Sequence, residues 1–152
     1  MGFLLPALIV VLLDQASKQF FWILGKNFDV IDSFLRVTLV RNSGAAFGML
    51  QGGRIFLVFS SVIAAIFIIF LAQRIPAEEK AKRIFLGMIL GGALGNLVDR
   101  LYPGHVIDFI DMGFGAHRWP VYNIADTAVT IGGILLIITF ALKREEGPDQ
   151  TE

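Results

Sequence analysis

Residues 55–72 have the sequence IFLVFSSVIAAIFIIFLA, a run of apolar and small side chains with no charged residue. A helix needs about 20 such residues to cross the hydrocarbon core of a bilayer. A helix that is apolar on every side must be covered on every side, by the core of a larger protein or by lipid. This stretch therefore predicts a buried or membrane-spanning helix, and the rest of the chain decides between the two.

Three more apolar stretches, at residues 3–24, 84–98 and 121–142, accompany it. The chain has 152 residues, of which 55% are hydrophobic and only 17% are charged. Soluble domains usually contain about 25% charged residues because their surfaces face water. Too little polar chain is left here to cover four buried helices. We therefore predict a mainly α membrane protein, a bundle of four transmembrane helices.

The membrane topology follows from the distribution of basic residues. We expect one domain, residues 1–152, with helices at about 3–24, 55–72, 84–101 and 121–142. The loop 73–83 is dense in basic residues, and Lys143 and Arg144 follow the last helix, which predicts that the loop and the tail 143–152 are cytoplasmic. Both termini are then cytoplasmic, residues 25–54 and 102–120 lie outside, and the end of the tail is expected to be disordered.

The first apolar stretch differs from a cleaved signal peptide. It lacks a basic start, and Asp14 and Lys18 interrupt the region that should be uninterrupted and apolar. We therefore interpret it as a retained helix.

The two outer segments have different patterns. Leu35 to Leu39 alternate apolar and polar side chains, which is the period of a half-buried strand, and turn residues follow at 42–44. This predicts a small extracytoplasmic β-element between the first two helices. Residues 102–120 are rich in glycine and in aromatic rings, which favour the headgroup level of a membrane.

Composition excludes several kinds of site. The formal net charge is zero, so nothing draws the chain to nucleic acid. The absence of cysteine excludes disulfides, thiolate metal sites and a cysteine nucleophile. Only two histidines are present, which argues against a histidine-rich metal site, and we expect no metal or other cofactor.

Ionisable residues inside a bilayer are costly, so each needs a reason. Asp14 and Lys18 are four residues apart and share one helix face. They form either a buried ion pair that locks the first helix to its neighbours or a support for a functional site.

The third helix carries two ridges of residues at four-residue spacing. The first ridge consists of Gly87, Gly91 and Gly95, and the second of Gly92, Asn96 and Arg100. Glycines at this spacing let another backbone approach closely, so the first ridge predicts helix packing. The second ridge resembles the wall of a polar cavity, although a single asparagine also serves as a link between helices. Asp99 has Arg100 beside it as a local partner.

Two acids are expected to meet near the outer membrane face. Asp108 follows the third helix, while Asn123 and Asp126 share a face at the start of the fourth. We expect Asp126 about five residues inside that helix, roughly 8 Å from its outer end. Two carboxylates placed close together share a proton, as the dyad of aspartic proteases does. The ionised acid would activate water and the protonated acid would hydrogen-bond the scissile carbonyl. Asp111 is the alternative to Asp108.

Five segments together resemble the lipoprotein signal peptidase (signal peptidase II) family. They are DQASK at 14–18, RNSGAAF at 41–47, GGALGNLVDR at 91–100, VIDF at 106–109 and YNIAD at 122–126. Their order and spacing match the family over nearly the whole chain. The departures are small: Ile107 stands where valine is common, and Tyr122 where phenylalanine is common.

The resemblance implies an activity and a site. Asp108 and Asp126 would be the catalytic aspartates. The supporting and substrate-binding residues would be Asp14, Lys18, Asn42, Gly92, Asn96, Arg100 and Asn123. The family resides in the bacterial cytoplasmic membrane, removes the signal peptide from diacylglyceryl-modified prolipoproteins just before the lipidated cysteine, needs no metal and is inhibited by globomycin-type cyclic peptides. The outer β-element would form a cradle on the membrane surface, and the loop after Asp108 a mobile flap. We expect a monomer surrounded by membrane lipids.

Two other functions compete with this interpretation. A small proton- or ion-coupled transporter would use Asp14, Lys18 and Asp126 as a relay. Transporters often contain repeats with sites near the midplane, and no repeat is evident here. A non-enzymatic assembly subunit would use the polar residues only to hold helices together.

Overall fold

The computed structural model describes residues 2–44 and 52–145, with side chains to Leu142. The order of elements is α1 (Leu4–Leu24), β1 (Phe28–Ile31), β2 (Leu35–Asn42), α2 (Arg54–Arg74), α3 (Lys80–Leu101), β3 (Val106–Phe114), β4 (His117–Arg118) and α4 (Ile124–Glu145). All four helices are long and apolar enough to cross a membrane, which confirms the predicted helical bundle. Residues 45–47 of the RNSGAAF segment and the end of the tail, 146–152, lie outside the described residues.

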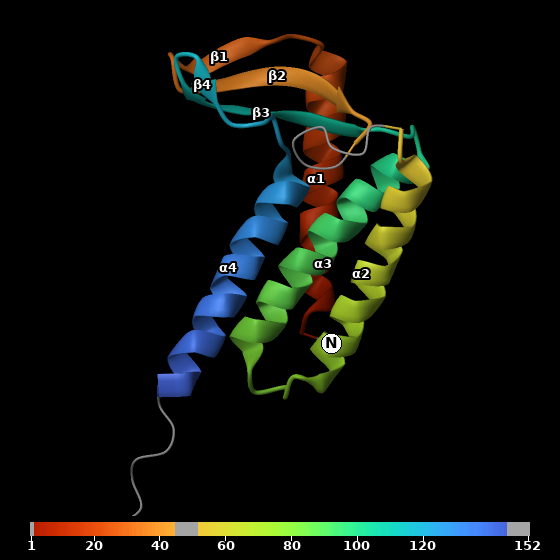
Figure 1. The fold of residues 1–152 in the computed structure, drawn as a ribbon, viewed down its shortest axis with the longest axis vertical. Coiled ribbons are helices and arrows are strands. Elements are labelled where there is room, and N and C mark those ends of the chain that lie inside the picture. Colours follow the sequence, from red (N-terminus) through yellow and green to blue (C-terminus); the bar gives the residue numbers. More distant parts are fainter. Residues whose placement is uncertain (1, 45–51, 146–152) are drawn as a thin grey trace, which may run out of the picture.

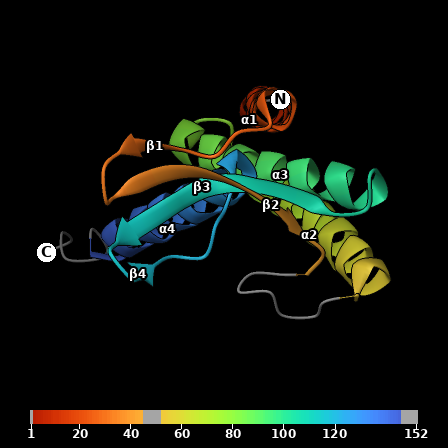
Figure 2. The same ribbon diagram turned by 90° about the horizontal axis from the view of Figure 1, so that it is seen from above.

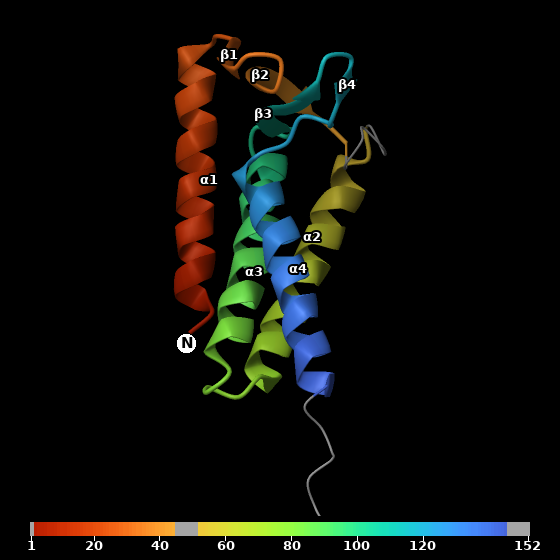
Figure 3. The same cartoon turned by 90° about the vertical axis from the view of Figure 1, so that its left-hand side faces the viewer.

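Helix α3 is the centre of the bundle and contacts each of the other three helices (Figure 3). Half of its apolar span is buried by the protein, against about a fifth for the others. Large apolar side chains on α1, α2 and α4 point outward, as Leu12, Phe67 and Ile137 do. Such surfaces are stable in lipid, where outward-facing apolar side chains lose nothing.

The ridge of Gly87, Gly91 and Gly95 packs against α1, as its spacing predicts. A methyl group on Gly91 would lie 2.6 Å from the carbonyl oxygen of Ala7, closer than such atoms approach. On Gly95 it would lie 2.6 Å from a carboxylate oxygen of Asp14. Glycine is therefore needed here because the α1 backbone and its polar residues touch α3 directly.

A four-stranded antiparallel sheet in the order β1-β2-β3-β4 lies across one end of the bundle (Figures 1 and 2). The start of α1 and the end of α4 lie at the opposite end (Figure 1). The predicted strand at 35–39 is present and extends to Asn42. However, the segment after Asp108, which we expected to be a loop, contains the rest of β3 and all of β4. Strand β3 pairs with β2, bringing Val40 opposite Asp108.

Helix α4 begins at Ile124, three residues later than predicted, so Asp126 lies in its first turn rather than five residues inside. The main chain of Tyr122 is still bonded to β3, with its N–H donating to Ile110 at 3.0 Å. Asn123 then caps the helix: its side-chain oxygen accepts the N–H of Asp126 at 3.0 Å. The result places Asp126 directly beneath the sheet.

Helix α3 begins four residues earlier than predicted, and aromatic rings cover basic residues of its first turn. Lys82 lies over the ring of Phe140, and Arg83 lies 5.9 Å from the ring of Phe3. These contacts let the long side chains lie along apolar surface while the helix continues.

Candidate active site

Asp108 is buried at the point where β3 passes over the helices, and only 2% of it is exposed. Both of its carboxylate oxygens accept hydrogen bonds from amide groups. Asn42 at the end of β2 donates to Oδ2 at 2.9 Å, and Asn123 donates to Oδ1 at 2.7 Å. Three elements of the fold therefore converge on this one carboxylate.

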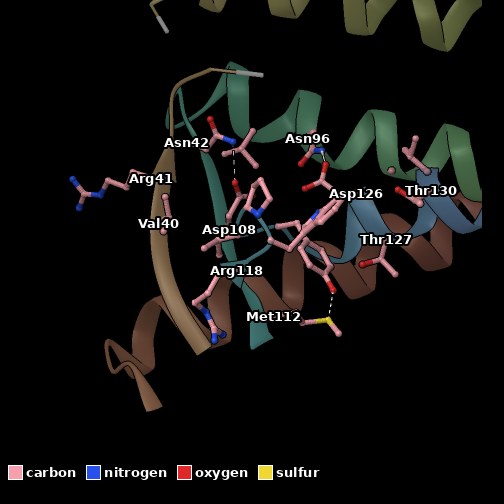
Figure 4. A pocket seen from close by; sticks show the side chains of 18 of the residues that line it. Val40, Arg41, Asn42, Asn96, Asp108, Met112, Arg118, Asp126, Thr127 and Thr130 are labelled. Carbon is pink, nitrogen blue, oxygen red and sulfur yellow. Dashed lines mark hydrogen bonds between the residues drawn. The ribbon is translucent and has the colours of Figure 1, made fainter. Parts of the chain in front are cut away.

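Asp126 faces the same space from the first turn of α4, and it is only partly buried (Figure 4). Asn96 of α3 donates to its Oδ1 at 2.8 Å, and the backbone N–H of Asn123 lies 3.3 Å from its Oδ2. Asn123 thus contacts both acids, with its side chain on Asp108 and its main chain on Asp126. The two carboxylates that we predicted to meet are connected through this single residue.

The amide groups around the acids have fixed orientations. The oxygen of Asn42 accepts the N–H of Gly44 at 2.9 Å. The oxygen of Asn123 accepts a hydrogen bond from the N–H of Asp126, and that of Asn96 accepts one from the ammonium group of Lys18 at 3.1 Å. Because each amide oxygen is already engaged by a donor, each amide nitrogen must face a carboxylate. The site therefore presents only N–H donors to the two acids.

Burial raises the pKa of Asp108 to about 6. The N–H groups of Asn42 and Asn123 act in the opposite direction, while the nearby charge of Asp126 adds to the increase. Asp108 therefore changes its protonation state near neutral pH. An acid with such a pKa can exchange a proton with a substrate under physiological conditions.

A second polar cluster lies deeper, between α1 and α3. Lys18 lies 2.7 Å from Asp14 and 2.8 Å from Asp99, and all three side chains are buried. Gln15 also donates to Asp99, at 3.0 Å, and Asp14 accepts the N–H of Ala125 at the start of α4, at 2.9 Å. The cluster thus joins three helices, and Lys18 connects it to the acid pair through Asn96.

Asp99 and Gln15 were not among the predicted site residues, and Asp99 binds Lys18 where we had considered a local pair with Arg100. A signal was available in the sequence. The glycine ridge at 87, 91 and 95 reaches Asp99 at the next step of four residues, which places Asp99 on the face that touches α1.

Gly92 and Arg100 complete the predicted set. A methyl group on Gly92 would collide with the carbonyl oxygen of Ala125, so this glycine lets α4 approach α3. Arg100 donates weakly to the carbonyl oxygens of Asn96 and Gly44, both at 3.4 Å. Its charge lies at the outer end of α3, near the acids.

A cavity of about 1480 Å³ opens beside the two acids. It runs from the lower side of the sheet, near Trp119, into the groove where Gly92 and Ile131 lie. Asp108, Asp126, Asn42, Asn96 and Arg100 line it. Asp111 does not: it binds Arg118 at 2.6 Å and Thr38 at 2.9 Å on the sheet. A pair of acids beside an open cavity suits the hydrolysis of a bond in a bound substrate.

Comparisons with known proteins show which proteins this chain resembles. The family model described as signal peptidase (SPase) II matches residues 6–142. A curated lipoprotein signal peptidase from Syntrophus aciditrophicus (strain SB) is 43% identical, over 95% of this chain and 94% of its own length. Two solved structures of bacterial membrane enzymes obtained by the in meso method are each 35% identical to this chain. One has a TM-score of 0.85 and covers 99% of this chain and 93% of its own, and the other has a TM-score of 0.80 and covers 91% of each.

A family match over most of the chain and a relative so similar along nearly its whole length lead to one conclusion. The chain belongs to the signal peptidase II family, the lipoprotein signal peptidases.

Proposed function

We propose that the chain is an aspartic endopeptidase that cleaves diacylglyceryl-modified prolipoproteins immediately before the lipidated cysteine. The observation that carries this proposal is the bridge through Asn123, which contacts Asp108 at 2.7 Å and caps the turn that holds Asp126. A bridge of this kind holds two acids in one geometry on two different elements. Preorganised acids at fixed positions reduce the barrier to proton transfer.

The proposed step needs one proton on the acid pair. Asp126 in its ionised form removes a proton from water, whose oxygen attacks the carbonyl carbon before the cysteine. Asp108, whose pKa is raised to about 6, donates its proton to the carbonyl oxygen. As the resulting diol collapses, Asp108 takes a proton back from one hydroxyl, Asp126 gives its proton to the leaving nitrogen, and the C–N bond breaks. The products are a signal peptide with a new carboxylate and a lipoprotein with a free amine on its cysteine.

The surrounding residues take supporting roles in this proposal. Asn42, Asn96 and Asn123 orient the acids, and Asp14 and Lys18 hold Asn96 and α4 in place. Gly92 allows the close contact of α3 and α4, and Arg100 places a positive charge beside the site. The substrate would enter from the bilayer, so that its acyl chains stay in contact with membrane lipids.

The proposed orientation has both termini in the cytoplasm, with the sheet and the acid pair near the outer face. It rests on the basic loop 73–83 and on the common end of the bundle shared by the start of α1 and the end of α4 (Figure 1). The signal peptide of a precursor crosses the membrane and ends at the outer boundary, which is the proposed depth of the acids. We also propose that the chain acts as a single-domain monomer.

A cleavage assay on purified, diacylglyceryl-modified precursor tests this function. Asp108→Asn and Asp126→Asn are each expected to reduce the rate by about 10²-fold to 10⁴-fold, because each removes one proton-transferring group. A globomycin-type cyclic peptide should block the unmodified enzyme. Both variants should accumulate in the membrane and unfold at temperatures near that of the unmodified protein.

Asp111→Asn is the matched control, since Asp111 is also a buried acid of β3 but faces away from the cavity. It should retain cleavage within about tenfold, far above the two active-site variants. Full activity in either Asp108→Asn or Asp126→Asn would overturn the assignment, and activity lost only in Asp111→Asn would mean that Asp111 is the catalytic acid.

A further inference from the structure

Residues 117–122 form one edge of the sheet and line the cavity without interruption. Several main-chain hydrogen bonds tie this run to β3, and the carbonyl oxygen of Tyr122 accepts two of them, from Phe109 at 3.0 Å and Ile110 at 2.8 Å. Trp119 donates its N–H to the carbonyl oxygen of Met112 at 2.7 Å, and Tyr122 donates to Ile110 at 3.0 Å. The main chain of residues 117–122 therefore lines one side of the cavity, from Tyr122 near the acids to His117 farther away.

The main chain of Arg118 faces away from β3. In an antiparallel pair, opposed residues alternate between those that exchange hydrogen bonds and those that do not. Trp119 bonds Met112, so the next opposed pair, Arg118 and Gly113, is of the non-bonded kind. The N–H and C=O of Arg118 therefore point to the outer side of β4, which is the last strand in the described part of the sheet.

The position of this edge is held by the side chain of Arg118. Its Nε lies 2.6 Å from Asp111, and its Nη2 donates to the main-chain oxygen of Asp111 at 2.9 Å. Pro120 follows two residues later and has no N–H to donate. Additional pairing at this edge is therefore confined to a short stretch around Arg118.

We propose that this edge binds the extended segment of the prolipoprotein that follows the cleavage point, through the N–H and C=O of Arg118. This inference rests on the proposed function. The occupant follows from the continuity of the cavity, which is lined both by the helices and by residues 117–122. In the proposed function the membrane-embedded signal peptide would lie on the side of the helices, so the segment after the cysteine would leave toward the sheet. Addition of a strand to a sheet edge recognises the main chain and is independent of sequence.

The geometry also predicts which residue is bound. Gly113, the residue opposite Arg118, is five positions along β3 from Asp108. At about 3.3 Å per residue this is a distance of roughly 17 Å, which an extended substrate spans with about five residues. A substrate running in this direction is antiparallel to β4, so one residue, about the fifth after the scissile bond, exchanges both hydrogen bonds with Arg118.

A set of lipidated precursors tests this with the unmodified enzyme. In each precursor one peptide N–H, from the third to the seventh residue after the scissile bond, is replaced by an ester oxygen. We expect KM to rise by about twofold to tenfold at one position near the fifth, and to stay unchanged at the residue before it. Equal KM values across the scan would overturn the proposal. Failure of the all-amide precursor to be cleaved would instead contradict the proposed function.

Two enzyme variants provide an independent check. Arg118→Pro and Arg118→Ala both remove the guanidinium group, but only proline removes the N–H. With a precursor that extends ten residues past the cysteine, Arg118→Pro should have the higher KM; with one truncated two residues past it, the two variants should have equal KM. Equal values on the long precursor would contradict the proposal. If thermal unfolding shows that Arg118→Pro is misfolded, the ester scan alone decides.

Discussion

The molecule holds two groups of acids that lie close together but differ in how their charge is balanced. Asp14 and Asp99 share the ammonium group of Lys18, at 2.7 and 2.8 Å. Asp108 and Asp126 have no cation at hydrogen-bond distance among the described residues, and amide and backbone N–H groups surround them instead. Only the second group opens onto the cavity.

This difference suggests a structural role for Asp14 and Asp99 and a chemical role for Asp108 and Asp126. A buried acid that is paired with a lysine has its charge balanced inside the protein, and the pair holds helices together. Asp108 is buried without such a partner, and burial raises its pKa to about 6, so that it can pass a proton to a substrate. The role of a carboxylate here therefore depends on whether a cation lies within hydrogen-bond distance of it.

The largest expected effect on stability is in the lysine-paired group. Lys18→Met keeps the volume of the side chain but leaves Asp14 and Asp99 buried without a positive charge. Removing one partner of a buried ion pair typically reduces the free energy of unfolding by about 3–5 kcal/mol. Chemical unfolding in detergent should show this loss, with reduced accumulation in the membrane.

Lys26→Met is the control, because Lys26 is exposed in the outer segment. It should leave the free energy of unfolding nearly unchanged. If Lys18→Met were as stable as the unmodified protein but inactive, the lysine would belong to the chemistry, and the contrast between the two groups of acids would fail.

The helices and most of the site were predictable from sequence, because lipid requires long apolar runs and makes every polar residue within them conspicuous. The pairing of Lys18 with Asp99 was not predicted, since it depends on how α1 and α3 are rotated against each other. Only the continuation of the glycine ridge to Asp99 indicated that rotation.

Strands β3 and β4 were missed for a different reason. The sequence Val106-Ile-Asp-Phe-Ile-Asp-Met112 does not alternate between apolar and polar residues. One part of the strand packs on α1, where the rings of Phe109 and Phe21 are 4.5 Å apart, while Asp108 faces the cavity. A strand covered on both sides loses the period of two that identifies a half-buried strand.

The raised pKa of Asp108 predicts that the rate of cleavage depends on pH. Asp108 carries the shared proton below about pH 6 and loses it above, so kcat/KM of the unmodified enzyme should fall as pH rises through about 6. The N–H of Asn42 stabilises the ionised form of Asp108 and lowers its pKa. Asn42→Ala should therefore move this fall to a higher pH, in addition to slowing cleavage.

Asn27→Ala is the control for this measurement. Asn27 also accepts a backbone N–H on the sheet, that of Leu39 at 3.0 Å, but it does not line the cavity. Its pH profile should coincide with that of the unmodified enzyme. The proposed role of Asn42 would be contradicted if the fall in kcat/KM shifted by the same amount in Asn42→Ala and Asn27→Ala, or if it moved to lower pH in Asn42→Ala.

The smallest effect is expected at an ion pair of similar length on the surface. Arg36 and Asp29 of the sheet are 2.7 Å apart, as Lys18 and Asp14 are, but their side chains are 43% and 48% exposed. Water screens this attraction and already solvates both charges, so such pairs contribute about 0–1 kcal/mol. Arg36→Gln should change the free energy of unfolding by less than about 1 kcal/mol and leave cleavage unaffected. The two ion pairs match in length and differ in exposure. If Arg36→Gln reduced the free energy of unfolding almost as much as Lys18→Met, burial would not explain the stabilising effect of the Lys18–Asp14 pair.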